Sequence, residues 1–153
     1  MDIVDRPLSA TDQEYITEYV ARGIATLRLD AQSTPPIIVP AIARHVEAER
    51  QQVAILDQDA YAVIILSMGY LWGTQVCHAY AWEWRLVGRG EDVATQIVSP
   101  QRAFVVHPLR FIKQFLDDSV RPSTIQLLFN MLEPAALVQS APQAQPNGYQ
   151  WLG

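Results

Sequence analysis

The residues best suited to chemistry are the single cysteine and the three histidines of the chain. Cys77 and His78 are adjacent, and a thiolate nucleophile needs a base beside it and a third group that orients the base. Neighbouring residues of one helix point about 100° apart, so this pair is poorly placed for a hydrogen bond between side chains. His107 reaches Cys77 only if the fold brings the two together. The sequence therefore favours a small buried thiol over a nucleophile.

A metal site is the second chemistry to weigh. His45 and Glu49 lie four residues apart and share one face of an expected helix, a spacing that zinc sites use. The paired motif His-Glu-x-x-His is absent, and no second histidine lies nearby. One cysteine and three histidines build no four-ligand zinc site unless carboxylates join them. We interpret His45 and Glu49 as a surface pair, and we expect no metal and no cofactor.

Glu83 lies between Trp82 and Trp84 and is the best candidate for acid–base chemistry. A general acid needs an apolar cleft that raises its pKa, and nothing in the sequence indicates a cleft. In a regular strand Glu83 faces away from both tryptophans, so we expect it to pair with an arginine such as Arg102 or to be solvated. A small enzyme that uses Glu83, His78 or His107 stays an alternative.

The remaining polar motifs are typical of turns. Gly88-Arg89-Gly90 lacks both the following helix and the Lys-Ser/Thr of a phosphate-binding loop, so a hairpin turn is the better interpretation. Glu91-Asp92 and Asp117-Asp118 lack the alternating oxygen ligands of a calcium loop. We expect both acidic pairs to be solvated.

The charge distribution points to a macromolecular partner. The chain of 153 residues has a net charge of −5, and residues 1–60 hold ten acids against five arginines. An acidic protein repels phosphate backbones, so we expect no nucleic acid partner. Complementary charge speeds association with a basic partner. The predicted partner-binding residues are Glu47, Glu49, Asp57 and Asp59, and self-association stays open.

Helices dominate the first half of the predicted fold. Apolar residues at three- to four-residue spacing predict a helix over residues 9–27, with a cap at Ser9 or Thr11. Prolines favour an extended segment over residues 37–39, followed by a helix over residues 41–56. A third helix starts after Asp57 or Asp59 and ends near Ala81. It is apolar nearly all round, which is typical of a helix surrounded by protein.

Period-two alternation then predicts three strands, over residues 82–87, 93–98 and 103–107, joined by short turns. Two short helices follow, over residues 109–116 and 125–132. The expected fold class is α+β, with the N-terminal helices and a long buried central helix packed on a three-stranded antiparallel meander. We expect one domain over residues 1–134 and a Pro/Gln/Ala-rich tail over residues 135–153. Its Tyr149, Trp151 and Leu152 fold back or dock on a neighbour.

The expected compartment follows from the first residues of the sequence and from its long apolar stretch. Residues 1–15 carry two early aspartates and no apolar run, which is unlike a signal peptide and predicts a cytoplasmic protein. Residues 60–82 are uncharged and long enough to span a membrane. Their polar residues and acidic flanks favour a buried central helix, so we expect no membrane partner.

The segment from Tyr61 to Leu132 resembles small bacterial proteins of uncharacterised function with helix–meander–helix order. The similar stretches are GYLWG, WEWRLV, EDVATQIVSP, AFVVHPLRFIKQFL and TIQLLFNML. Some proteins of this kind are thought to be immunity partners of secreted antibacterial toxins. The resemblance implies the fold and brings no catalytic residues. We therefore expect a cytoplasmic immunity protein that occludes the active site of a toxin, with an adaptor or chaperone for a secreted effector as the alternative.

Overall fold

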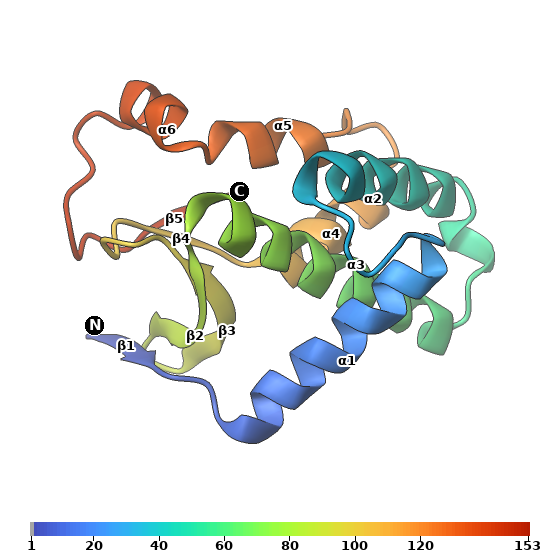
Figure 1. Ribbon diagram of the computed structural model, residues 1–153, viewed down its shortest axis with the longest axis horizontal. Coiled ribbons are helices and arrows are strands. Elements are labelled where there is room, and N and C mark those ends of the chain that lie inside the picture. Colours follow the sequence, from blue (N-terminus) through green and yellow to red (C-terminus); the bar gives the residue numbers. More distant parts are fainter. Residues whose placement is uncertain (1) are drawn as a thin grey trace.

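The computed structural model describes residues 2–153, which form an α+β fold with six α-helices and a five-stranded mixed sheet. Figure 1 shows the sheet at one end of the molecule and the helices grouped around α3. The helices are α1 (Ala10–Thr26), α2 (Pro35–Arg50), α3 (Gln58–Tyr80), α4 (Pro108–Asp117), α5 (Ile125–Met131) and α6 (Pro134–Ser140), with a 3-10 turn η1 (Val53–Ile55). The strands are β1 (Ile3–Arg6), β2 (Glu83–Arg89), β3 (Asp92–Val98), β4 (Phe104–Val106) and β5 (Gln150–Leu152).

The apolar helix α3 is the centre of the core, as its sequence predicts. It packs against α1, α2, α4 and β2, and Met68, Leu71 and Trp72 are fully buried in it. Its two glycines allow close approach: a methyl group on Gly69 would lie 3.1 Å from the Cα of Leu109 in α4. The same helix is long and apolar enough to cross a membrane by composition, but 56% of its most apolar window is buried in protein.

Helix α2 starts earlier than the prolines predict. Residues 37–39 were expected to be extended, but Pro35 and Pro36 occupy the first turn, where no intrahelical N–H bond is needed. Pro40 therefore lies inside the helix and removes one backbone hydrogen bond. Burial of Ile38 and Val39 outweighs that loss, because both side chains enter the main core. Helix α2 also ends earlier than expected, at Arg50, and η1 continues the chain.

The sheet contains the expected antiparallel meander, β2–β3–β4, and adds a strand at each edge. The order is β1-β2-β3-β4-β5, with β1 antiparallel to β2 and β5 parallel to β4. One face packs on the helices through residues such as Trp84 and Ile97. The other face carries a small cluster of Val87, Val98 and Val105.

The turn between β2 and β3 is tighter than predicted. Strand β2 continues through Gly88 to Arg89, and only Gly90 and Glu91 form the turn. Gly90 has a φ of 59°, a conformation that glycine adopts without strain. A methyl group on Gly88 would collide with the backbone of Asp92, so the hairpin strands need glycine there as well.

The C-terminal segment has more structure than the expected tail. Residues 134–140 form α6, whose first turn is capped by the Glu133 carboxylate. The last residues fold back on the sheet: Trp151 of β5 lies beside Val105 of β4, and Trp151 and Tyr149 pack on the outer cluster. The division of the chain at residue 134 stays a prediction.

Candidate functional site

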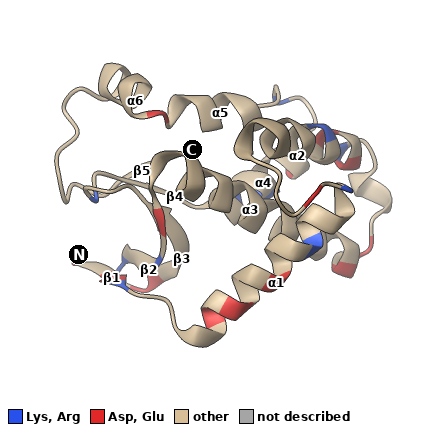
Figure 2. Cartoon of the chain, viewed as in Figure 1, with Lys and Arg blue, Asp and Glu red and all other residues tan. Residues whose placement is uncertain are grey.

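The four predicted partner-binding acids flank the short connection between α2 and α3, and we call this region the acidic corner (Glu47, Glu49, Asp57 and Asp59). Glu47 and Glu49 belong to the end of α2, and Asp57 and Asp59 begin α3. The seven residues between Arg50 and Gln58 join the two ends. Figure 2 shows acidic positions on α2, at the start of α3 and along α1.

The four acids have different local roles. Glu47 accepts two hydrogen bonds from the guanidinium of Arg50, at 2.9 and 3.0 Å. Asp57 caps α3, because its side chain accepts the backbone N–H of Ala60 at 2.8 Å. Glu49 and Asp59 form no ion pair with any residue from 2 to 153. These two acids are therefore the ones free to meet an outside charge.

Ile55, an exposed aliphatic residue of the connection between α2 and α3, was not predicted from the sequence. Its side chain is 81% exposed in η1, while its neighbours Val53 and Leu56 pack on the core. The sequence signal is weak, because the segment holds three large apolar residues and only the fold shows that Val53 and Leu56 are the two that contact the core. An exposed aliphatic residue within a polar and charged rim is the pattern of a protein–protein interface.

Arg50 is the last residue of α2 and lies close in sequence to the acids of the corner, but its side chain is turned into the protein. The residue is only 8% exposed, and its guanidinium lies over the ring of Phe115 at 4.0 Å. It donates to the backbone carbonyls of Asp118 and Arg121 at 3.2 and 2.6 Å. Its positive charge compensates that of Glu47, so the uncompensated negative charge of the corner belongs to the other three acids.

A groove between α1 and β2 gathers two of the residues considered for catalysis. This α1–β2 groove has a volume of about 520 Å³ and is lined by Ile16, Val20, His78, Glu83, Trp84 and Arg85, among others. No hydrogen bond joins His78 to Glu83 or to any other side chain in the described part of the chain. The groove therefore contains an imidazole and a carboxylate without the oriented contact that general acid–base catalysis needs.

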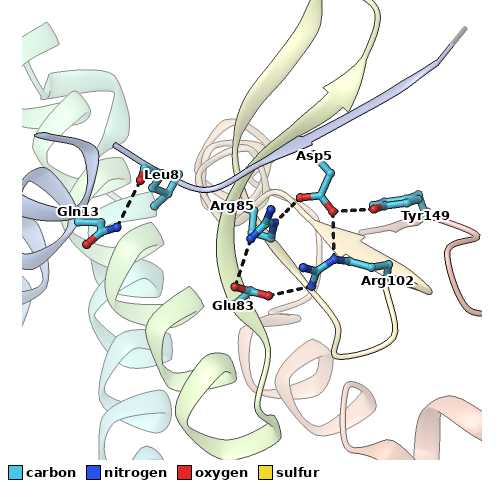
Figure 3. Close-up of polar contacts among 7 residues, drawn as sticks. All are labelled: Asp5, Leu8, Gln13, Glu83, Arg85, Arg102 and Tyr149. Atoms are coloured by element: carbon cyan, nitrogen blue, oxygen red, sulfur yellow. Dashed lines mark hydrogen bonds and ion pairs between the residues drawn. The ribbon is translucent and has the colours of Figure 1, made fainter. Parts of the chain in front are cut away.

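Glu83 belongs instead to an ion network on the outer face of the sheet (Figure 3). Arg102 bridges two carboxylates, with Nη1 at 2.8 Å from Glu83 and Nε at 3.0 Å from Asp5. Arg85 contacts the same two carboxylates, and the hydroxyl of Tyr149 donates to Asp5 at 2.6 Å. The expected pair of Glu83 with Arg102 is confirmed, but Asp5, Arg85 and Tyr149 come from distant segments and were missed.

Within the outer-face ion network, Asp5 and Arg85 each stabilise the charged form of the other. Burial pushes the pKa of Asp5 upward, but hydrogen bonds from Tyr149 and Arg85 outweigh it and hold that pKa below its usual range. The hydrogen bond to Asp5 raises the pKa of Arg85. Two acids and two arginines thus neutralise one another, which suits a structural tie between β1, β2 and the C-terminal segment.

Cys77 is a partly buried thiol that packs against the main core. Burial, followed by the nearby charge of Glu83, raises the pKa of Cys77 to about 12. Burial and the charge of Arg110 lower the pKa of His107, whose Nδ1 accepts the backbone N–H of Arg110 at 3.3 Å. Within residues 2–153 no hydrogen bond joins Cys77 to His78 or His107. A protonated thiol without a base is a poor nucleophile.

The structure also places the remaining motifs. Asp117 was expected to be solvated, but it pairs with Lys113 at 2.6 Å and accepts the hydroxyl of Tyr61, and these contacts lower its pKa. Glu91 and Asp92 are exposed at the hairpin turn. His45 and Glu49 form no ion pair, and no group of three His, Cys, Asp or Glu residues is placed for a metal among residues 2–153.

Comparison of the chain with models of protein families, with curated proteins and with solved structures finds no match. The assignment of function therefore depends on the acidic corner, the α1–β2 groove and the surfaces around them.

Proposed function

We propose that this chain is a protein-binding module whose acidic corner docks on a basic protein partner. The observation that supports this most directly is Ile55, an 81% exposed aliphatic residue that follows Glu47 and Glu49 and precedes Asp57 and Asp59 in the sequence. Burying one apolar residue supplies affinity, while the surrounding acids speed association and exclude acidic partners.

In its specific form the proposal is a cytoplasmic immunity protein. The acidic corner would cover a basic cleft of a secreted antibacterial toxin and block its active site without any chemistry of its own. The acidic excess of residues 1–60 supports this form, because long-range attraction favours the fast capture that a toxin inhibitor needs.

Charge variants of the corner test the proposal, and the local roles of the four acids decide the design. Reversal at Glu47 or Asp57 would also break the Arg50 pair or the α3 cap, so these positions are left intact. The test protein carries Glu49→Lys and Asp59→Lys, and a second protein carries Ile55→Asp. The partner to use is the product of the adjacent gene, co-expressed and purified.

Stopped-flow mixing should show a slower association for Glu49→Lys/Asp59→Lys at low salt, with the difference shrinking as salt screens the charges. Ile55→Asp should mainly speed dissociation. The matched control is Glu14→Lys/Glu18→Lys, which makes the same charge change on exposed positions of α1. Equal effects of both charge pairs, or none at Ile55, would reject the acidic corner as the docking surface.

An adaptor or chaperone role has one observation in its favour. Figure 2 shows few charged positions over α5 and α6, and Leu127, Met131 and Val138 are exposed there. Removal of the C-terminal tail would not test this role cleanly, because the tail contributes β5 to the sheet. Leu127→Ser/Met131→Ser is the better test, since client binding would be lost in this variant and kept in Glu49→Lys/Asp59→Lys.

A further inference from the structure

A cavity of about 340 Å³ lies between α6, the C-terminal segment and the start of the sheet, and we call it the α6 cavity. Tyr80 and Trp82 line it at the junction of α3 and β2, Phe104 at the start of β4 and Leu137 in α6. This volume is within the range of small-molecule sites, about 300–1,000 Å³.

The lining of the α6 cavity contains no charged side chain. Three other pockets of the described residues each contain at least one arginine and one histidine. A charged ligand would lose its hydration in the α6 cavity without gaining an opposite charge, which is strongly unfavourable. An occupant of this cavity is therefore neutral.

Gln101 lines the cavity with an amide that can donate or accept, and three further polar side chains there can donate a hydrogen bond. Trp72, Trp84 and Trp151 each donate their indole N–H to an acceptor in the protein. Trp82 is only 5% exposed, lines the cavity, and has no such acceptor among residues 2–153. The Tyr80 hydroxyl also lacks a partner there, and burial raises its pKa, so it keeps its proton at neutral pH.

A third donor is the hydroxyl of Ser99, whose oxygen already accepts the backbone N–H of Phe104 at 3.0 Å. Backbone hydrogen bonds fix the C-terminal segment, which forms one side of the cavity. The N–H of Asn147 donates to the carbonyl of Gln101 at 2.9 Å, and the N–H of Gln150 donates to the carbonyl of Ala103 at 2.8 Å. Four prolines line the cavity and further limit backbone motion: Pro100, Pro134, Pro142 and Pro146. The cavity is thus largely preformed, as ligand sites usually are.

We propose that the α6 cavity binds a small neutral molecule with a mostly apolar body and an acceptor oxygen such as a carbonyl. The apolar body would pack among Phe104, Leu137 and the prolines. The acceptor oxygen would take the N–H of Trp82 and the hydroxyl of Tyr80. The α6 cavity shares no residue with the acidic corner, so a test of ligand binding there is independent of the proposed protein partner.

The neutral fluorophore prodan, an aromatic ketone, is a suitable probe because its emission shifts to the blue when its ring is buried. The test titrates the full chain with prodan and measures both the emission shift and the melting temperature. Prodan should bind at one site and raise the melting temperature, since a ligand that binds only the folded state stabilises it.

Two variants locate the binding site. Tyr80→Phe removes one donor and keeps the ring contact with Phe129, so binding should weaken about five- to tenfold. Ala144→Phe fills the cavity from its lining and should abolish binding. The controls are Tyr15→Phe and Ala21→Phe on α1, which remove a hydroxyl and add bulk away from the cavity and should leave binding unchanged.

The absence of saturable prodan binding to the unaltered chain would overturn the proposal. So would binding that Tyr80→Phe and Ala144→Phe both leave unchanged, because the dye would then sit on an exposed apolar surface such as that around Leu127. If Ala144→Phe fails to fold, the weakening by Tyr80→Phe alone against the Tyr15→Phe control decides the outcome.

Discussion

At the scale of single residues, Gly73 is under the tightest steric constraint in α3. A methyl group there would lie 2.4 Å from the ring of Trp84 and 2.9 Å from Pro108. We expect Gly73→Ala to lower the free energy of unfolding by about 1–3 kcal/mol through overpacking, although alanine is the better helix former. Urea denaturation measures the loss.

The double variant Gly73→Ala/Trp84→Phe is the control, because the smaller ring removes the atoms that collide. Its free energy of unfolding should exceed the value expected if the two single effects added. Simple additivity would show that Trp84 is not the obstacle to a side chain at position 73.

Asp57 offers a second residue-scale prediction with a built-in control. Its carboxylate caps α3, whereas Asp59, exposed in the same first turn, caps nothing. Asp57→Ala should cost about 1 kcal/mol of stability and Asp59→Ala only a few tenths, while Asp57→Asn should retain most of the cap. Thermal unfolding of the three variants checks this, and equal losses for Asp57→Ala and Asp59→Ala would contradict it.

The residue roles that the sequence predicted correctly depend on neighbours along the chain. Ser9 and Asp57 cap helices through the N–H three residues on, and strand alternation placed Glu83 on the face away from Trp84. The roles that it missed depend on distant segments: Arg50 turns inward because Phe115 offers a ring to cover. Spacing in the sequence carries no information on such contacts.

At the scale of elements, β1 is tied to the sheet by a charge. Strand β1 pairs with β2, and Asp5 adds contacts to Arg85, Arg102 and Tyr149. Asp5→Asn should lower the free energy of unfolding at pH 7 by about 1–3 kcal/mol, since hydrogen bonds to charged groups are the stronger ones. Urea denaturation at several pH values measures it.

The pH dependence of this difference follows from the lowered pKa of Asp5. The unfolded chain binds the proton more readily than the folded chain, so the carboxylate stabilises the fold above its ordinary pKa of 3.8. That contribution is lost as pH falls through the lowered folded-state pKa, and the two proteins should then converge. Asp2→Asn, at an exposed position, is the control and should change little at any pH.

Most elements were predictable because their apolar spacing is strong, and the exceptions have physical causes. β1 has only four residues, too few for a period to show, and β5 has three. Both gain their stability from pairing with a neighbouring strand. In α2 the prolines favoured an extended segment, but burial of Ile38 and Val39 in the core decided the conformation.

At the scale of the whole molecule, charge and apolar surface are separated. The acidic excess belongs to residues 1–60, while residues 122–153 carry a single charged side chain, Glu133. The three regions therefore differ in charge. The acidic corner is negative, the outer-face ion network contains paired opposite charges, and the α6 cavity is lined by uncharged residues. This separation is consistent with one surface for a basic partner and one partly open, uncharged pocket for a neutral molecule.

The C-terminal segment decides whether the molecule is one cooperative unit. Trp151 and Tyr149 cover Val105, which is completely buried although β4 has only three residues. Trp151→Ala should lower the free energy of unfolding by about 2–3 kcal/mol, and a chain that stops before Tyr149 should lose more, because it also loses β5 and the hydrogen bond to Asp5. Leu127→Ala, at a more exposed position, should cost less than about 1 kcal/mol. An unchanged urea midpoint for the shortened chain would instead support a domain that ends near residue 134 and a dispensable tail.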